Sequence, residues 1–163
     1  MQQPAKVYSE PNFWELKMIS EDDKKKGLKG IEQGRADYAY RCVEDAKRDL
    51  KEDADKYKSY CKKIPMMLKI NGLGNTIGFI KAKKEKAYGI LYKQVSEYLY
   101  NEKKCIYPFD TEQELLKQII QLDTPEYRAI THELLALFSW MKRFSEGLIK
   151  GKEDKQEKDH AEG

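Results

Sequence analysis

Apolar residues recur at steps of three and four between residues 31 and 64, which is the period of an α-helix. The positions with this spacing are Ala39, Val43, Ala46, Leu50, Ala54, Tyr57 and Cys61. Charged side chains of both signs fill the positions between them, and no proline interrupts the stretch. The pattern predicts one long amphipathic helix, or two helices with a break near Lys51–Asp53, whose charged positions form a solvated face.

A second long helix is predicted near the C-terminal end. Asp123 and Thr124 stand directly before Pro125, and a capping side chain followed by proline is typical of a helix start. An apolar seam then runs over three heptads, through Tyr127, Ile130, Leu134, Leu137, Met141, Phe144 and Leu148. Leu135, Phe138 and Trp140 widen the apolar surface beyond this seam, so we expect the helix to pack against neighbouring helices.

Two shorter helical segments are predicted between the long ones. Apolar spacing from Tyr88 to Leu99 predicts a helix that ends near Asn101, followed by a loop over residues 102–108. Thr111 stands before an acidic first turn and predicts a capped helix, which carries Leu115, Leu116, Ile119, Ile120 and Leu122. Since no segment shows the alternation of a strand, the predicted fold is all-α, a compact multi-helix bundle with a long N-terminal core helix and a long C-terminal helix.

Residues 63–84 are the most informative stretch, because an apolar turn, three glycines and five lysines occur together. Pro65 suits the first turn of a short helix over residues 65–70. Asn71 and Gly72 can adopt the left-handed conformation that ends a helix. Asn75 or Thr76 can then cap a second short helix over residues 75–84. We predict a tight corner that presents cations on one surface and suits the binding of a polyanion better than catalysis.

The two ends of the chain lack this regular pattern. Residues 1–30 are predicted to be an irregular extension with a solvated turn or loop at 21–27. Earlier in this extension, Phe13 and Trp14 either pack onto the body of the protein, which is the favoured alternative, or dock a partner. Residues 31–150 form one helical domain, and residues 151–163 form a charged, disordered tail.

Composition narrows the class of protein. The chain has 31 basic and 28 acidic residues, so a basic surface requires that the charges be segregated. Three widely spaced cysteines, Cys42, Cys61 and Cys105, favour a reducing cytoplasm and argue against a disulfide framework or a structural zinc site. No segment reaches the roughly 20 apolar residues of a membrane helix, and no signal peptide is recognisable, so we expect a cytoplasmic protein.

Catalytic motifs were tested and rejected. Gly72, Gly74 and Gly78 have the wrong spacing for a dinucleotide-binding motif, and no strand precedes them. His132-Glu133 resembles the start of a zinc-protease motif, but the position of the second histidine is Ala136. With two histidines in the chain, no catalytic triad can be assembled. We therefore expect a protein that is not an enzyme and that has no cofactor, metal site or catalytic residue.

Three segments together resemble a known family. They run from Arg35 to Glu44, from Tyr57 to Lys84, and from Glu126 to Phe144, and their most specific parts are the lysine–proline–NGLG–lysine stretch and the stretch EYR…LALxxWxKRF. Over residues 31–149 the chain looks like the small α-helical subunit of the type III-B CRISPR effector, the Cmr (RAMP-module) complex. The resemblance does not extend to residues 1–30.

The resemblance implies a non-catalytic subunit for antiviral defence that assembles in the central filament of a ribonucleoprotein. Its partners would be guide (crRNA) and target RNA, the backbone and other Cmr subunits, and neighbouring copies of itself. Carried onto this sequence, the candidates for RNA contact are Lys63, Lys69, Lys81, Lys83, Lys84, Arg128, Lys142 and Arg143. The candidates for protein contact are Phe138, Trp140 and His132.

Each candidate has a plainer alternative. The lysines near 81–84 could be a solvated helix end, because cations favour a helix C-terminus without any ligand. Phe138 and Trp140 could be core residues, and His132 could lie on a polar face of the last helix. The main alternative for the whole protein is an all-helical scaffold or adaptor that makes no direct contact with nucleic acid.

Overall fold

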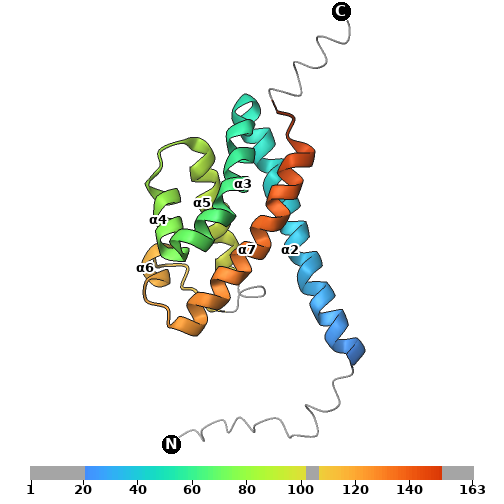
Figure 1. Ribbon diagram of the computed structural model, residues 1–163, viewed down its shortest axis with the longest axis vertical. Coiled ribbons are helices and arrows are strands. Elements are labelled where there is room, and N and C mark those ends of the chain that lie inside the picture. Colours follow the sequence, from blue (N-terminus) through green and yellow to red (C-terminus); the bar gives the residue numbers. More distant parts are fainter. Residues whose placement is uncertain (1–20, 102–106, 152–163) are drawn as a thin grey trace, which may run out of the picture. The chain divides into compact units, whose positions relative to one another are not determined.

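The computed structural model describes residues 21–101 and 107–151, and the side chains of residues 30–101 and 107–151. Within these ranges the structure consists of α2 (Glu21–Leu50), a 3₁₀ turn (Lys51–Asp53), α3 (Ala54–Asn71), α4 (Leu73–Ala82), α5 (Lys86–Tyr100), α6 (Leu115–Ile119) and α7 (Thr124–Leu148) (Figure 1). The described residues contain helices and connecting turns, which confirms the all-α prediction with two long helices.

The N-terminal helix begins earlier than predicted. Residues 21–30 are predicted to be irregular, but α2 begins at Glu21. By their contacts, residues 1–33 and residues 34–163 form two separate units. The correction has a physical reason, because acidic residues at a helix start followed by lysines favour the helix dipole and outweigh Gly27 and Gly30. The predictions for residues 1–20 and for 152–163 lie outside the described residues.

The break between α2 and α3 matches the two-helix alternative. α2 ends at Leu50, and the 3₁₀ turn Lys51–Asp53 connects it to α3. Lys51 has a φ of 51°, a left-handed value that is costly for a residue with a Cβ atom. The change of direction is therefore concentrated at one strained residue of the connection.

α3 does not begin at Pro65, as the sequence suggested, but runs from Ala54 to Asn71 with the proline inside it. A proline within a helix removes one backbone hydrogen bond and crowds the carbonyl group four residues earlier. The residues around it explain why the helix continues. Ile64 is 0% and Leu68 2% exposed, so tertiary packing holds both sides of the proline in the core.

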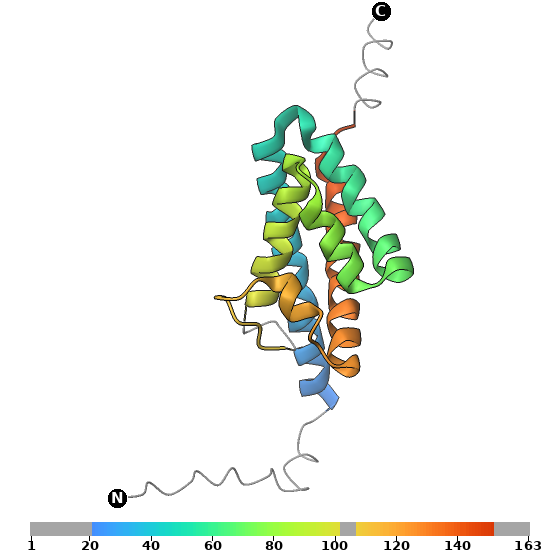
Figure 2. The ribbon, with the colours of Figure 1, turned by 90° about the vertical axis from the view of Figure 1, so that its left-hand side faces the viewer.

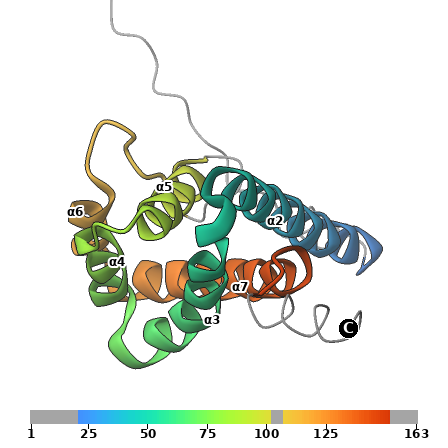
Figure 3. The ribbon, with the colours of Figure 1, turned by 90° about the horizontal axis from the view of Figure 1, so that it is seen from above.

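α3 and α7 run antiparallel and form the central pair (Figures 1 and 3). The ammonium group of Lys58 donates to the carbonyl oxygen of Ile149 at 3.0 Å, and Lys62 pairs with Glu146. Further along, the backbone amide of Gly74, just after α3, bonds to α7 at Tyr127. α4 packs against α3, α5 and α6 (Figure 2). The largest fully buried side chains include Tyr57, Ile64, Leu73, Ile77, Leu91, Ile119, Ile130 and Phe138.

A buried ion pair connects α2 to α7. Arg35 donates from Nε and Nη2 to the two carboxylate oxygens of Glu133, at 3.0 and 2.9 Å, and Tyr98 of α5 donates to the same carboxylate. Burial opposes ionisation of Glu133, but the hydrogen bonds from Arg35 and Tyr98 and the charge of Arg35 outweigh it and keep the pKa of Glu133 below its ordinary value. This pair was not predicted from the sequence.

A second buried network lies around Gln94 of α5. Its side chain accepts a hydrogen bond from Tyr57 of α3 at 2.8 Å and donates to the backbone carbonyl of Cys42 at 2.8 Å. Tyr38 of α2 donates to the backbone carbonyl of Gln94 at 2.6 Å. Burial raises the pKa of the Cys42 thiol to about 12, so this cysteine is a neutral core residue.

The segment before α7 differs from the prediction in one place and agrees in another. Thr111 does not cap a helix: residues 111–113 form a turn, and α6 begins at Leu115 and has five residues. The turn is stabilised by Asp110, whose carboxylate accepts from the backbone amide of Glu112 at 2.9 Å. At the start of α7, Asp123 and Glu126 form a reciprocal capping box beside the predicted proline.

Candidate nucleic-acid interface

The candidate interface begins with a stretch that has no acidic residue. Residues 56–84 contain eight lysines and neither aspartate nor glutamate. This stretch covers α3 from Lys56 onward, all of α4, and the first residues after α4. Basic and acidic residues are therefore segregated along the chain. Because the net charge is only +3, a basic surface requires such segregation. The absence of acids is visible in the sequence as a separate signal, independent of the glycine corner.

The corner between α3 and α4 is set by Gly72. Its φ of 80° and ψ of 170° belong to a region that is open to glycine and costly for other residues. A Cβ atom there would also lie 3.2 Å from the hydroxyl oxygen of Tyr127. The predicted special role of Gly72 is thus correct, although its ψ places it outside the left-handed helical region.

Tyr127 of α7 caps the start of α4. Its hydroxyl oxygen accepts a hydrogen bond from the backbone amide of Gly74 at 2.9 Å, one of the amides that a helix start leaves without a partner. The predicted capping by Asn75 or Thr76 is wrong. Both side chains donate instead, to the carbonyl oxygens of Asn71 and Gly72. The corner is therefore fixed by α7, from a site distant in the sequence.

Four of the five predicted lysines of this stretch are exposed and form no ion pair with any described residue. They are Lys63, Lys69, Lys83 and Lys84. Lys81 differs, because it pairs with Glu114, which also accepts a hydrogen bond from Tyr92 at 2.7 Å. The hydrogen bonds from Lys81 and Tyr92 lower the pKa of Glu114, so the carboxylate is charged at neutral pH and holds Lys81.

Aromatic rings support the far end of α4. Tyr60 stacks on Tyr88 with ring centroids 3.8 Å apart, and Phe79 meets Tyr88 edge-on. The ammonium group of Lys83 lies 4.8 Å from the centre of the Phe79 ring. Lys63 lies one turn after Tyr60 on α3, whereas Lys69 lies in the last turn of α3, next to the corner.

The cations of α7 do not form one group. Arg128 follows Tyr127 and lies in the turn of α7 at the corner, whereas Lys142 and Arg143 lie about 21 Å further along the helix. Lys142 is exposed and without an ion pair in the described part of the chain, and the guanidinium of Arg143 lies 6.0 Å from the centre of the Trp140 ring. The unpaired cations thus include lysines of the α3–α4 hairpin and Arg128 at the start of α7, whereas Lys142 lies apart from them near the other end of α7.

Several cations of α2 and α5, and Lys56 at the start of α3, are paired with acids that are close in the sequence. Arg41 pairs with Asp37, Arg48 with Asp45, Lys56 with Asp53 and Lys93 with Glu97, each at a spacing of three or four residues. Such pairs stabilise a helix by about 0.2–0.5 kcal/mol and leave little charge for a partner. The predicted solvated face of α2 agrees with this pattern.

The three candidates for protein contact have different environments. Phe138 is 0% exposed, so its predicted interface role is wrong and the side chain belongs to the core. The sequence pattern allowed Phe138 to be either a core residue or a contact for another protein. It lies beside the apolar seam of α7, and the pattern alone does not show whether neighbouring helices cover that side of the helix. Trp140 is partly buried and stacks on Phe144 at 5.4 Å. His132 is exposed on α7.

Three more apolar side chains are unexpectedly exposed. Met66 and Ile70 of α3 are 60% and 73% exposed; Met66 lies between the unpaired Lys63 and Lys69 in the sequence, and Ile70 directly follows Lys69. Ile120, just after α6, is 68% exposed and lies near Gly74 of the corner. The candidate surface therefore combines cations with apolar groups.

Fold and surface together define a class, which is a small all-helical protein with unpaired lysines on an acid-free helical hairpin. Among the described residues no group of three or more histidine, cysteine, aspartate or glutamate side chains could hold a metal ion. Nor does any helix in the described ranges have the length and apolar character needed to cross a membrane.

Comparisons with known proteins identify the family. The family model described as CRISPR-associated protein (Cas_Cmr5) matches residues 31–148, so the chain belongs to the Cmr5 family. A curated relative, the CRISPR system Cmr subunit Cmr5 of Thermus thermophilus, is 27% identical over 115 residues, which are 70% of this chain and 91% of the relative. The family predicted from the sequence is confirmed.

A solved structure supports the same conclusion. The crystal structure of a CRISPR-associated Cmr5 family protein, also from Thermus thermophilus, matches with a TM-score of 0.61 at 25% identity. The match covers 74% of this chain and 97% of that chain. The helical fold described above is thus the fold of this family.

Proposed function

We propose that this protein is a non-catalytic small subunit of a type III-B CRISPR ribonucleoprotein. It assembles in the centre of the complex with the other Cmr subunits and further copies of itself, and its basic surface lines the path of the guide RNA and its target. Guide–target pairing reads the sequence, so such a subunit needs cations that follow the sugar–phosphate backbone and no contacts to base edges.

The observation that carries the proposal is the group of unpaired lysines on an acid-free hairpin. Lys69 lies at the corner, and Lys83 and Lys84 lie about 15 Å away, at the other end of α4. Cations spread over this length match a stretch of phosphates better than a single anion. The corner itself is rigid, because Gly72 and the hydrogen bond from Gly74 to Tyr127 fix the angle between the two helices.

A second candidate function is a protein scaffold with no direct RNA contact. The exposed Met66, Ile70 and Ile120 favour it, because apolar groups of this size are typical of protein interfaces when they gather on one surface. In that case the lysines around them would form the polar rim of a protein contact.

The test uses the complex reconstituted with guide RNA, titrated with labelled target RNA across a salt series. The test variant changes four unpaired lysines to glutamine: Lys63, Lys69, Lys83 and Lys84. A control variant with the same loss of charge changes four paired cations: Arg41, Arg48, Lys56 and Lys93.

We expect the slope of log K against log salt to fall by up to about 3 in the test variant, since each phosphate contact contributes roughly 0.7–0.9. The control variant should keep the slope of the unchanged protein. Equal slopes for all three proteins, with normal incorporation of each into the complex, would reject RNA lining and leave the scaffold function.

A further inference from the structure

A groove lies between α2 and α7, away from the lysine hairpin. Tyr40 of α2 meets Phe144 of α7 edge-on, with ring centroids 5.4 Å apart, and Phe144 stacks on Trp140 at the same distance. One turn further along each helix, Glu44 and Lys47 of α2 and Leu148 of α7 line a cavity of about 310 Å³. Because these positions are one turn apart on each helix, the aromatic rings lie next to the cavity along the same two helices, and the rings and cavity together are named the α2–α7 groove.

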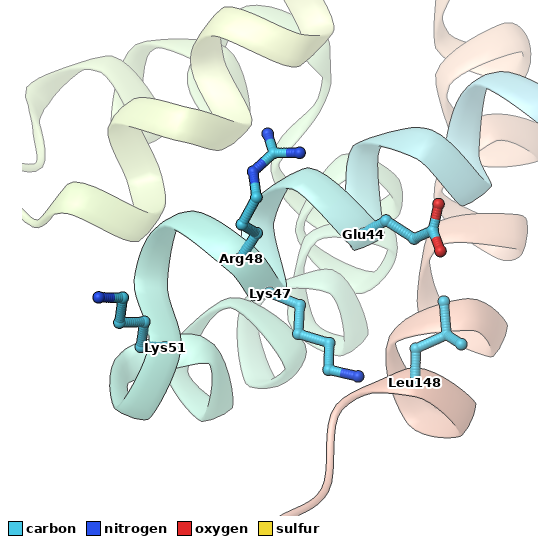
Figure 4. A pocket seen from close by; sticks show the side chains of 5 residues that line it. All are labelled: Glu44, Lys47, Arg48, Lys51 and Leu148. Atoms are coloured by element: carbon cyan, nitrogen blue, oxygen red, sulfur yellow. The ribbon is translucent and has the colours of Figure 1, made fainter.

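The two sides of the groove differ in chemistry. Figure 4 shows Glu44 and Lys47 on the side that faces Leu148, whereas Arg48 and Lys51, which also line the cavity, point away from Leu148. The α7 side is apolar, with Trp140, Phe144 and Leu148 at successive turns. Tyr40 is 39% exposed, so its ring is both a packing partner and part of the surface. The groove therefore has an aromatic centre, an apolar wall and a charged edge.

We propose that this groove binds a segment of a neighbouring protein subunit that carries an apolar side chain next to a carboxylate. The apolar side chain would enter the cavity beside Leu148, and the carboxylate would pair with Lys47, which has no ion pair among the described residues. The rings of Tyr40 and Trp140 would cover the rest of the segment. That the neighbour is a subunit of the same complex rests on the proposed function.

A protein segment fits this groove better than RNA does. Arg48 is already paired with Asp45 and Asp49, at 2.8 and 3.3 Å, and Glu44 adds an acid to the lining, so the groove offers a single carboxylate a partner in Lys47 but lacks the row of unpaired cations that a chain of phosphates needs. Partly exposed tyrosine and tryptophan, with Arg143 lying over the Trp140 ring, are the residue types that dominate binding energy in protein interfaces.

Tryptophan fluorescence tests the proposal on the full chain. The protein has two tryptophans, so the variant Trp14→Phe leaves Trp140, in the groove, as the sole reporter. This variant is titrated with each of the other subunits of the complex, purified without RNA, and then with the subunits together. We expect a blue-shifted emission and at least a twofold loss of acrylamide quenching of Trp140 when the neighbour binds.

Two substitutions in the reporter background locate the contact. Tyr40→Ala should weaken binding about thirtyfold, the loss typical of a central interface aromatic. Lys47→Glu should weaken it about tenfold through repulsion of the carboxylate. Lys117→Glu, the same charge change on α6 outside the groove, should bind like the reporter protein, and circular dichroism checks that all variants fold.

The proposal is overturned by any of three results. The first is an unchanged Trp140 signal with every protein subunit and with the assembled complex. The second is protection that appears only when guide RNA is present, which would make RNA the occupant. The third is protection already present in the isolated protein and lost when residues 152–163 are deleted, which would make the chain's own tail the occupant. None of these results depends on the salt slope of the lysine variants, so this proposal and RNA lining can fail separately.

Discussion

Breaking the Arg35–Glu133 pair should be among the most damaging single changes to this fold. The two side chains are 10% and 9% exposed, and both carboxylate oxygens of Glu133 are bonded to Arg35. Glu133→Leu removes the carboxylate on α7 that binds Arg35 and leaves the guanidinium inside the bundle. Removing one partner of a buried ion pair costs about 3–5 kcal/mol, whereas whole domains are stable by roughly 5–15 kcal/mol.

The measurement is urea unfolding followed by circular dichroism at 222 nm. With a slope of about 2 kcal/mol per molar urea, a loss of about 3–5 kcal/mol moves the midpoint down by about 1.5–2.5 M. Arg35→Met should cost a similar amount, since it leaves Glu133 buried and charged. The double variant Arg35→Met, Glu133→Leu removes both charges, and we expect it to be near neutral or more stable by about 1–4 kcal/mol.

The matched control is the exposed pair Arg41–Asp37 on the same helix. Its side chains are 60% and 68% exposed, so Arg41→Met should cost less than about 0.5 kcal/mol. If Glu133→Leu cost no more than Arg41→Met, the buried pair would not have the strength assigned to it. Additive single and double variants would likewise contradict the argument, because residues in direct contact must couple.

Three further predictions concern the connection, the corner and acid pH. Lys51→Gly should raise the free energy of unfolding by about 1 kcal/mol, since it relieves a positive φ at the α2–α3 connection, as denaturant titration can verify. Tyr127→Phe should lower that free energy by about 1–2 kcal/mol and lower hydrogen-exchange protection at the start of α4, because the amide of Gly74 loses its partner. The folded-state pKa of Glu133 lies below its ordinary value of 4.5, so ionised Glu133 contributes to the stability of the fold above that pH, and this contribution is lost as the pH falls through the folded-state pKa. Glu133→Gln should therefore make the free energy of unfolding depend less on pH in the acid range, as a pH series of urea titrations can show.

Helical periodicity was enough to predict most of the elements. The spacing from Ala39 to Cys61 anticipated α2 and α3, including the break at Lys51–Asp53. The seam from Tyr127 to Leu148 anticipated α7. These predictions succeed because burial of one face of a helix leaves a regular pattern in the sequence.

The errors occur where tertiary contacts outweigh local signals. Pro65 suggested a helix start, but Ile64 and Leu68 are buried on both sides of it and keep α3 continuous. Thr111 suggested a helix cap, but the turn after Asp110 satisfies its own backbone groups. Phe138 suggested an interface, but neighbouring helices cover it completely. For Pro65 and Phe138 the deciding contacts come from other helices, whereas at Thr111 a second local signal, the turn at Asp110, decides the structure.

The candidate site was predicted in part. The sequence pointed to Lys63, Lys69, Lys83 and Lys84, but it gave no way to separate them from Lys81, whose partner Glu114 is 33 residues away. The hydroxyl cap from Tyr127 to Gly74 joins residues 53 positions apart and has no local signature. The acid-free stretch over residues 56–84, in contrast, was visible in the sequence and predicts where unpaired charge accumulates.

This distribution of charge separates the residues that hold the fold from those available to a partner. Arg35, Lys58 and Lys81 each bind a group of another element and thereby fix the packing of helices. Lys63 and Lys69 make no such contact with the described residues. An acidic residue three or four positions from either lysine would have paired with it and stabilised α3 slightly, but α3 has none there. A helix that lacks this stabilisation keeps its cations available to a partner. Removal of the unpaired lysines should therefore leave the bundle intact, so a loss of RNA affinity in that variant reports on the surface and not on the fold.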